Sequence, residues 1–535
     1  MNARYVYEIT GMTCDHCAVM IKKALERLPG VSAEVSFATR KAVVDAPESL
    51  DSDRMTGAIR EAGYSVVGEE SDVSAVIIGS GSAAFAAAIQ LAASGRRITM
   101  VERGTLGGTC VNIGCVPSKI FIRQAELIHH ATHGPFPGIA IRDVVPDFAR
   151  LRHQQNARVE ELRTSKYAHI LEIHPGIRFL KGTASFVNNR TLKVVEDNGV
   201  EQHITADRVL IATGARPAVP DIPGLKDVPF WTSTEALAAQ NLPEHLLVLG
   251  GGFVACELGQ AFRRMGSRVT LFERGSALLS GVDPDLGKGL EKVFVEEGIG
   301  MKTHIRIASV RYEERRFILS TDQGIFTGDA LLVATGRAPN TEGLNLVAAG
   351  VETDARGYIR VDGHLRTNVS HIYAAGDCTT LPPFVYVAAA AGTRAASNML
   401  GEEKFLDVSV LPEVIFTDPA VAVVGLSETA ARTQGLSVES RVMGLELLPR
   451  ALANFDTRGF IKLVAETGTG RLVGAHILAA QAGEMIQTAH LAILHRMTVQ
   501  DLGDRLFPYL TMVEGLKLAA QSFTKEVANL SCCAG

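Results

Sequence analysis

Three pairs of cysteines are the residues in this chain that could most readily do chemistry. The 535-residue chain has eight cysteines, among them the pairs Cys14 with Cys17, Cys110 with Cys115, and Cys532 with Cys533. Thiolates are nucleophiles, electron donors and ligands for soft metal ions. Eight cysteines are too few for a secreted disulfide scaffold of this length. The pairs therefore predict redox or metal chemistry, whereas the single residues Cys256 and Cys378 are predicted to be buried in the core.

The first pair lies in the segment GMTCDHC, residues 11–17. The pattern places Cys14 and Cys17 on a loop that enters a helix, where the helix dipole lowers the pKa of a thiol and favours the thiolate. Two thiolates without a further cage of ligands suit a soft ion in low coordination, such as Cu(I) or Hg(II). A redox pair of the thioredoxin type is the alternative interpretation.

The elements around this pair form a unit over residues 1–68. Alternation of apolar and polar residues predicts strands at 5–10, 31–37, 41–46 and 64–68. The segments between them predict one helix that ends at Pro29-Gly30 and a second helix at 51–63. The order βαββαβ predicts a ferredoxin-like domain. The unit and its motif resemble the heavy-metal-associated domain, and this resemblance favours metal binding over redox chemistry.

An internal repeat predicts two dinucleotide-binding units. Residues 76–104 and 247–275 align without a gap, and each reads as strand, glycine turn, helix, strand and acidic residue. Such a fingerprint lets the backbone approach a pyrophosphate at a helix N-terminus, while the carboxylate binds ribose hydroxyls. The fingerprint residues are Gly79, Gly81, Ala84 and Glu102 in the first copy, and Gly250, Gly252 and Glu273 in the second.

Further strand ends belong to these units. RVLIATGARP at 208–217 and LLVATGRAPN at 331–340 each read as an apolar strand that ends in Ala-Thr-Gly, which includes Thr213 and Gly214 in the first. The segment HIYAAGD reads as a strand whose end places Asp377 near a bound cofactor. Two dinucleotide sites in one chain predict two cofactors, one of which passes electrons to the other.

The middle cysteine pair follows the first fingerprint directly, in GGTCVNIGCVPSK, residues 107–119. Cys110 and Cys115 are five positions apart, so a helix would need a local distortion to bring the two sulfurs together. A structural disulfide is disfavoured in a reducing compartment, and a zinc site lacks a second pair of ligands. The sequence therefore predicts a catalytic dithiol beside the first cofactor.

These motifs together resemble the flavoprotein disulfide oxidoreductases over residues 73 to about 530. The resemblance implies an α/β fold in which two Rossmann-like dinucleotide-binding domains and an α+β dimerisation domain follow the ferredoxin-like metal-binding domain. The expected domains are residues 1–68 for metal binding, 73–218 and 338–408 for FAD, 219–337 for NAD(P), and 409–535 for dimerisation with the Cys-Cys tail.

The same resemblance assigns the site residues. It implies FAD near Gly79, Gly81, Glu102, Lys119 and Asp377, and a nicotinamide nucleotide near Gly250, Gly252 and Glu257. It also implies that Cys115 faces the flavin, that Cys110 meets the substrate, and that the chain is a homodimer with an active site shared between subunits.

One departure from the family pattern concerns proton transfer. Disulfide-reducing members use a histidine paired with a glutamate near the C-terminus; here Glu514 is present, but Tyr509 occupies the expected place of the histidine, and no histidine follows His495. A phenol with a pKa of about 10 is a poor proton shuttle at neutral pH.

A thiophilic metal ion needs thiols and no proton shuttle, so the chain is expected to reduce Hg(II). Cys14, Cys17, Cys532 and Cys533 would relay the ion to Cys110 and Cys115, and by resemblance Tyr167 would also line the site. A disulfide reductase similar to dihydrolipoyl dehydrogenase, with a fused metal domain, is the alternative enzyme. A thiol metal buffer is the alternative without catalysis.

Composition limits the partners. A net charge of −5 and a pI of about 6.3 argue against nucleic acid as a partner. The apolar stretch 73–94 is interrupted by glycines and serines, so no stable membrane insertion is expected, and the chain is predicted to be cytoplasmic.

Hg(II) would arrive on small thiols or metal-carrier proteins. Glu273 suits the ribose of NADH, Arg274 could pair with the 2′-phosphate of NADPH, and the family resemblance favours NADPH.

Overall fold

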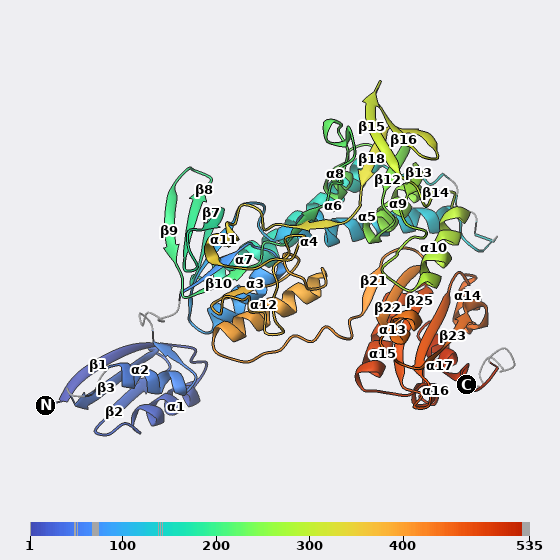
Figure 1. The fold of residues 1–535 in the computed structure, drawn as a ribbon. Helices are drawn as coiled ribbons and strands as arrows, with labels where there is room; N and C mark the ends of the chain where they lie inside the picture. Colours follow the sequence, from blue (N-terminus) through green and yellow to red (C-terminus); the bar gives the residue numbers. More distant parts are fainter. Residues whose placement is uncertain are drawn as a thin grey trace.

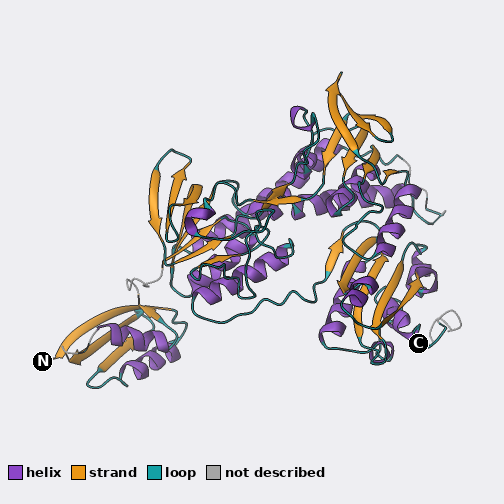
Figure 2. Ribbon diagram, in the orientation of Figure 1, coloured by secondary structure: helices purple, strands orange, loops and turns teal. Residues whose placement is uncertain are grey.

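The computed structural model describes residues 2–47, 50, 52–66, 74–136, 138, 139, 141 and 143–526. These residues form four units, the second of which is completed by segments that follow the third in the chain (Figure 1). Each unit is a sheet covered by helices (Figure 2). The predicted fold class, mixed α/β with a separate N-terminal domain, is confirmed. No helix among the described residues is both long enough and apolar enough to cross a membrane.

The N-terminal unit has the predicted ferredoxin-like order. Its sheet runs β2-β3-β1-β4, and its core includes the fully buried Ile21, Leu25 and Ile59. The first helix ends at Leu25, before the predicted stop at Pro29-Gly30. The elements are β1 Asn2–Thr10, α1 Asp15–Leu25, β2 Ser32–Ser36, β3 Lys41–Pro47, α2 Ser52–Glu61 and β4 Ser65–Val66.

The second unit is built on a seven-stranded sheet in the order β20-β10-β5-β6-β7-β8-β9. The strands from β20 to β7 are parallel, and the strands from β7 to β9 form an antiparallel meander. The apolar run Ala75–Ile78 fits a central parallel strand, which is buried on both faces. The strands are β5 Ser74–Ile78, β6 Arg97–Glu102, β7 Ile177–Phe186, β8 Thr191–Glu196, β9 Glu201–Thr205, β10 Arg208–Ile211 and β20 Ile372–Ala374.

The helices of this unit include the two that carry the redox cysteines. Helix α12 packs on α3 so closely that a Cβ at Gly392 would lie 2.1 Å from the carbonyl oxygen of Ala83. The helices are α3 Ser82–Ala93, α4 Gly108–Ile113, α5 Cys115–Thr132, α6 Phe148–Arg163, the π-helix η1 Thr164–Ala168, α7 His169–Ile173, α11 Leu346–Ala349 and α12 Val385–Met399.

The third unit repeats the parallel arrangement in the order β14-β13-β12-β18, with a separate antiparallel sheet β15-β16-β17. The short strands β11 Ala215–Pro217 and β19 Arg337–Pro339 pair where the chain enters and leaves this unit. The other elements are η2 Leu225–Asp227, α8 Ser233–Ala238, β12 His245–Leu249, α9 Phe253–Met265, β13 Arg268–Phe272, α10 Pro284–Glu296, β14 Gly300–Lys302, β15 Ile307–Glu313, β16 Arg316–Thr321, β17 Gly324–Gly328 and β18 Ala330–Val333.

The last unit is an antiparallel sheet in the order β21-β22-β25-β24-β23, with α15 packed on β22 and β25. Its elements are β21 Glu413–Ile415, β22 Ala420–Gly425, α13 Glu428–Thr433, β23 Val438–Gly444, η3 Leu445–Leu447, α14 Pro449–Asn454, β24 Phe460–Glu466, β25 Leu472–Ala479, α15 Ala482–Leu494, α16 Val499–Gly503 and α17 Glu514–Gln521.

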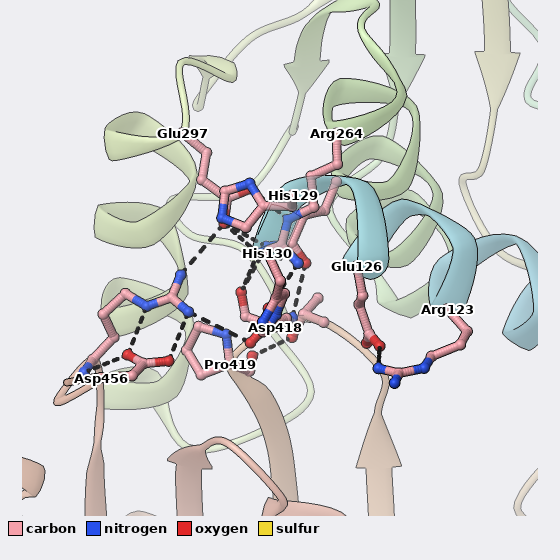
Figure 3. Close-up of polar contacts among 12 residues, drawn as sticks. Arg123, Glu126, His129, His130, Arg264, Glu297, Asp418, Pro419 and Asp456 are labelled. Atoms are coloured by element: carbon pink, nitrogen blue, oxygen red, sulfur yellow. Dashed lines mark hydrogen bonds and ion pairs between the residues drawn. The ribbon is translucent and has the colours of Figure 1, made fainter. Parts of the chain in front are cut away.

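A charged cluster, which we call the Asp418 cluster, joins the second, third and last units (Figure 3). Asp418, just before β22, accepts from Arg264 of α9 at 2.8 Å and contacts His130 of α5 at 3.1 Å. Arg264 also pairs with Glu297 at 2.6 Å, and its side chain is only 2% exposed. Arg458 and Asp456 complete the cluster from the last unit.

Candidate active site

The redox pair lies at a break between two helices. Cys110 lies in α4, which ends at Ile113, and Cys115 is the first residue of α5. Gly114 separates the helices, and a Cβ there would lie 3.0 Å from the carbonyl oxygen of Thr109. This break is the local distortion that the five-residue spacing of the cysteines required.

The two thiols have different electrostatic surroundings. Neither forms a disulfide in this structure, and both are partly buried. A hydrogen bond to Cys115, together with burial, raises the pKa of Cys110. The same hydrogen bond lowers the pKa of Cys115 against the effect of burial, and the positive charge of Lys119 lowers it further. Cys115 is therefore the more acidic of the two thiols.

Lys119 lies one turn after Cys115 and connects three units. Its ammonium group is 2.7 Å from a carboxylate oxygen of Glu257 in α9. The other oxygen of Glu257 accepts a hydrogen bond of 3.0 Å from the backbone N–H of Phe416 in the last unit. The sequence placed Lys119 and Glu257 in different nucleotide sites and did not predict that they pair.

The first glycine turn joins β5 to α3. Gly79 has φ +113°, and a Cβ there would lie 2.3 Å from the carbonyl oxygen of Ala212. Gly81 precedes α3, and no side chain caps this helix. Its first N–H groups are therefore open to an anionic ligand, as a dinucleotide pyrophosphate requires. Ala84 is fully buried where the helix packs against the sheet.

The acidic residue of the first fingerprint is held in place by its neighbours. Glu102 ends β6 and accepts hydrogen bonds from the backbone N–H of Gly104 and, at 2.7 Å, from the hydroxyl of Ser80. Ser80 is fully buried, and sequence reasoning gave it no role. A cavity of about 610 Å³ opens beside this loop between Thr105, Arg163 and Lys181. It offers room for the adenosine end of a dinucleotide, but Arg163 and Lys181 are too distant in sequence for a local motif to indicate them.

Other predicted residues meet at the same edge of the sheet. Thr213 and Gly214 follow β10, and Asp377 lies three residues after β20, which pairs with β10. Burial raises the pKa of Asp377 against the charge of Arg337, whose Nε lies 3.8 Å away. The carboxyl ends of adjacent parallel strands form the usual ligand edge of such sheets.

Helix α4, which carries Cys110, packs directly against the first glycine turn at this edge of the sheet. A Cβ at Gly108, in the first turn of α4, would lie 2.6 Å from the Cα of Gly81. Tyr167 of η1 covers the turn before α4, since a Cβ at Gly107 would lie 3.2 Å from its ring. Burial and the neighbouring Cys110 raise the pKa of Tyr167. The structure thus brings Tyr167, Cys110 and the first glycine turn together.

The second glycine turn repeats the first. Gly250 has φ +115°, and a Cβ there would lie 2.4 Å from the carbonyl oxygen of Ala334. Gly252 precedes α9, which again has no side-chain cap, and nothing lies within 4 Å of a Cβ built on it. Glu273 and Arg274 directly follow β13. Residues 213–214 and 335–336 thus have equivalent positions beside the two glycine turns, and each turn leaves a helix N-terminus uncapped, as a dinucleotide pyrophosphate requires.

The N-terminal pair forms a two-thiol site. Cys14 precedes α1, Cys17 lies in its first turn, and the two sulfurs are 3.7 Å apart. Hydrogen bonds from Thr13 and Tyr64 lower the pKa of Cys17 to about 6. Among the described residues, no group of three or more His, Cys, Asp or Glu side chains is placed to hold a metal ion. Two neighbouring thiols are the kind of ligand set that a soft metal ion prefers.

Of the C-terminal candidates, the described residues Tyr509 and Glu514 do not lie beside Cys110 and Cys115 of the same chain. Tyr509 lies between α16 and α17 and is 55% exposed. Both helices belong to the last unit, away from α4 (Figure 1). Glu514 is buried, one of its carboxylate oxygens has no hydrogen-bond partner among the described residues, and burial raises its pKa. Cys532 and Cys533 lie outside the described residues.

Comparison with known proteins defines the class. The family model "Pyridine nucleotide-disulphide oxidoreductase" matches residues 73–392, its dimerisation domain matches 411–520, and the heavy-metal-associated domain matches 6–65. The chain belongs to the pyridine nucleotide-disulphide oxidoreductase family and is an FAD-dependent oxidoreductase.

Its relatives include proteins named mercuric reductase. The one from Acidithiobacillus ferrooxidans is 52% identical, with 100% of both chains covered, and the one from Shigella flexneri is 50% identical, with 99% of both covered. Among solved structures, the HOCl-induced flavoprotein disulfide reductase RclA from Escherichia coli is 31% identical with a TM-score of 0.76, covering 84% of this chain and 100% of that one.

Proposed function

We propose that this chain is a mercuric reductase, which uses NAD(P)H to reduce thiol-bound Hg(II) to Hg(0) and so detoxifies mercury. The observation that carries the proposal is the Cys110–Cys115 pair, fixed against the first glycine turn, in a chain that has Tyr509 where disulfide-reducing relatives have a histidine. Relatives named mercuric reductase at 52% and 50% identity over the full chain support it.

The two nucleotide sites would bind different cofactors. The N-terminus of α3, with Glu102, Lys119 and Asp377 around it, would hold FAD, and the N-terminus of α9 would hold the nicotinamide nucleotide. The chemistry that FAD would supply when bound is transfer of an electron pair from NAD(P)H to the Hg(II) that the cysteine pair holds. Lys119 keeps Cys115 in its thiolate form beside this cofactor.

The substrate is Hg(II) carried on two thiolates. Cys110 and Cys115 displace the carrier thiolates by ligand exchange, so that the ion is never released into solution. Two electrons from NAD(P)H then convert Hg(II) to Hg(0), both mercury–sulfur bonds break, and Cys110 and Cys115 are left as thiolates. The net reaction turns NAD(P)H into NAD(P)⁺ and a proton, and Hg(0), which does not bind thiolates, leaves.

The outlying cysteines deliver the ion. Small thiols or metal-carrier proteins would bring Hg(II) to Cys532 and Cys533, and two sulfurs on one chain displace two separate thiols at high effective concentration. The dimerisation domain suggests a homodimer, so we infer that this tail serves the redox pair of the other subunit, where Tyr509 also contributes. Cys14 and Cys17 would gather the ion when cellular thiols are scarce.

The test is turnover by variants of the redox pair. Cys110→Ala and Cys115→Ala should each abolish Hg(II)-dependent oxidation of NADPH and NADH while the protein stays yellow with bound FAD. Cys14→Ala, in the N-terminal unit, is the matched control and should keep its activity when excess thiol is present. Full turnover in either redox variant, or lipoamide reduction by the wild type as fast as Hg(II) reduction, would contradict the proposal.

A further inference from the structure

Glu273 has the same position in the second nucleotide site as Glu102 in the first. Each follows a strand of the repeat, and each accepts a hydrogen bond from a backbone N–H two residues later, from Gly275 and Gly104 respectively. The glycine turns also match, since a Cβ at Gly79 or at Gly250 would collide with the carbonyl oxygen of an equivalent alanine, Ala212 or Ala334. The two carboxylates therefore face equivalent parts of two dinucleotides.

The second carboxylate lies directly against its glycine turn. Ser80 separates Glu102 from the turn, but the equivalent residue in the second copy is Gly251. A Cβ at Gly251 would lie 2.8 Å from one oxygen of Glu273, and a Cβ at Gly275 would lie 3.0 Å from the other. The Glu273 carboxylate is thus fixed between two glycines at the point where an adenosine ribose meets the turn.

The surrounding cations do not neutralise this carboxylate. Within the described residues Glu273 takes part in no ion pair of 4.0 Å or less, and neither does Arg274, whose side chain is exposed. Lys302, beside Phe272 in the adjacent strand, has its ammonium group over the ring of Phe326, 5.5 Å from the centroid. A 2′-phosphate would therefore meet a fixed negative charge, whereas a 2′-hydroxyl would donate a hydrogen bond to it.

We propose that Glu273 makes NADH, and not NADPH, the preferred coenzyme of this chain. The proposal rests on the proposed function only in assigning the second site to a nicotinamide nucleotide, and it departs from the preference for NADPH that the family resemblance implies. Repulsion between the Glu273 carboxylate and a neighbouring 2′-phosphate, partly screened by water, corresponds to a preference for NADH over NADPH on the order of 10- to 100-fold.

The test compares coenzyme binding and flavin reduction in the holoenzyme, without mercury. Calorimetric titration of the oxidised protein should give tighter binding of NAD⁺ than of NADP⁺. Anaerobic mixing should show that NADH bleaches the flavin absorbance faster than NADPH at equal, subsaturating concentrations. Glu273→Gln keeps an acceptor for the N–H of Gly275 but removes the charge, and should reduce the preference for NADH by about 10-fold or more, mainly by improving NADPH.

Two further variants make the test specific. Arg274→Ala should leave the preference within about twofold, and so should Glu296→Gln, which removes an exposed carboxylate from α10 in the same unit. Tighter binding of NADP⁺ by the wild type, or an unchanged preference in Glu273→Gln, would overturn the inference. A protein that prefers NADH but does not reduce Hg(II) would contradict the proposed function and leave this inference intact.

Discussion

Two charged side chains act on the Cys115 thiol in opposite directions. Lys119 lowers the pKa of Cys115 and Glu257 raises it, although the two residues pair with each other. The rate of alkylation reports the thiolate fraction, because the thiolate is the nucleophile. The environment of this one sulfur can therefore be tested by removing each charge in turn.

Lys119→Gln should raise the pKa of Cys115 and slow its alkylation by iodoacetamide at pH 7 by about 3- to 10-fold. Glu257→Gln should lower the pKa and shift the pH profile of alkylation in the opposite direction. The measurement is mass-spectrometric labelling of Cys115 in reduced protein from pH 5 to 9. Shifts of both variants in the same direction would show that a change of local structure, and not charge, controls this thiol.

Tyr509 separates the proposed reaction from disulfide reduction. Tyr509→His should not raise Hg(II) turnover, since ligand exchange between sulfurs needs no proton shuttle at that position. It should raise slow lipoamide reduction on the order of 10-fold or more, because a histidine next to the retained Glu514 can protonate a leaving thiolate. Steady-state rates with both substrates decide this, and Tyr509→Phe is the matched control that leaves lipoamide reduction low.

At the scale of elements, the first nucleotide unit depends on a close backbone contact between α3 and α12. Gly392→Ala would place a methyl group on the Ala83 carbonyl and force the two helices apart, at a cost of about 1–3 kcal/mol. The expected result is a lower thermal midpoint and weaker retention of FAD during gel filtration. Gly281→Ala, where nothing lies within 4 Å of the added Cβ, should leave both unchanged.

The elements that the sequence predicted best are those with a repeating local pattern. The gapless alignment of residues 76–104 with 247–275 predicted both strand–turn–helix units, and the structure contains them as β5-α3-β6 and β12-α9-β13. Alternation along residues 1–68 predicted the N-terminal unit, with an error of a few residues at the end of α1. Glycine turns and strand periodicity are local properties, so one sequence suffices to find them.

Contacts between distant segments could not be predicted in this way. The Lys119–Glu257 pair joins residues 138 positions apart, and Asp418 meets Arg264 across 154 positions. Nothing in the spacing of Arg163 or Lys181 indicated the cavity they line. Tyr167 was suggested by resemblance alone, and only the fold shows that it covers the turn before Cys110.

At the scale of the whole molecule, the Asp418 cluster holds three units together. Burial alone would raise the pKa of Asp418, but the hydrogen bond from His130 and the charges of Arg264 and Arg458 lower it well below its usual range. Asp418→Asn would leave the buried Arg264 with one of its two carboxylate partners. We expect a loss of about 3–5 kcal/mol, measured as a lower urea midpoint at pH 6.

The pH dependence of this loss follows from the two pKa shifts. The lowered pKa of Asp418 means that its contribution is present above the unfolded value near 4 and is lost as the pH falls below it. The raised pKa of His130 means that its contribution is present below about pH 6.5 and is lost as the pH rises through the folded value. The variant should therefore differ most from the wild type between about pH 5 and 6.5. Glu161→Gln, in an exposed pair with Arg158, should change the midpoint little at any pH.

Helix α5 belongs to one nucleotide unit by sequence and to the other by packing. Its 18 residues span about 27 Å, and Phe121, Ile122 and Ala125 lie in the core formed around α9. Proteins open in cooperative segments that follow packing and not chain order. The helix that begins with Cys115 should therefore unfold together with the third unit, which contains α9. A nucleotide bound to that unit would also stabilise the folded segment around the Cys115 thiol against local unfolding.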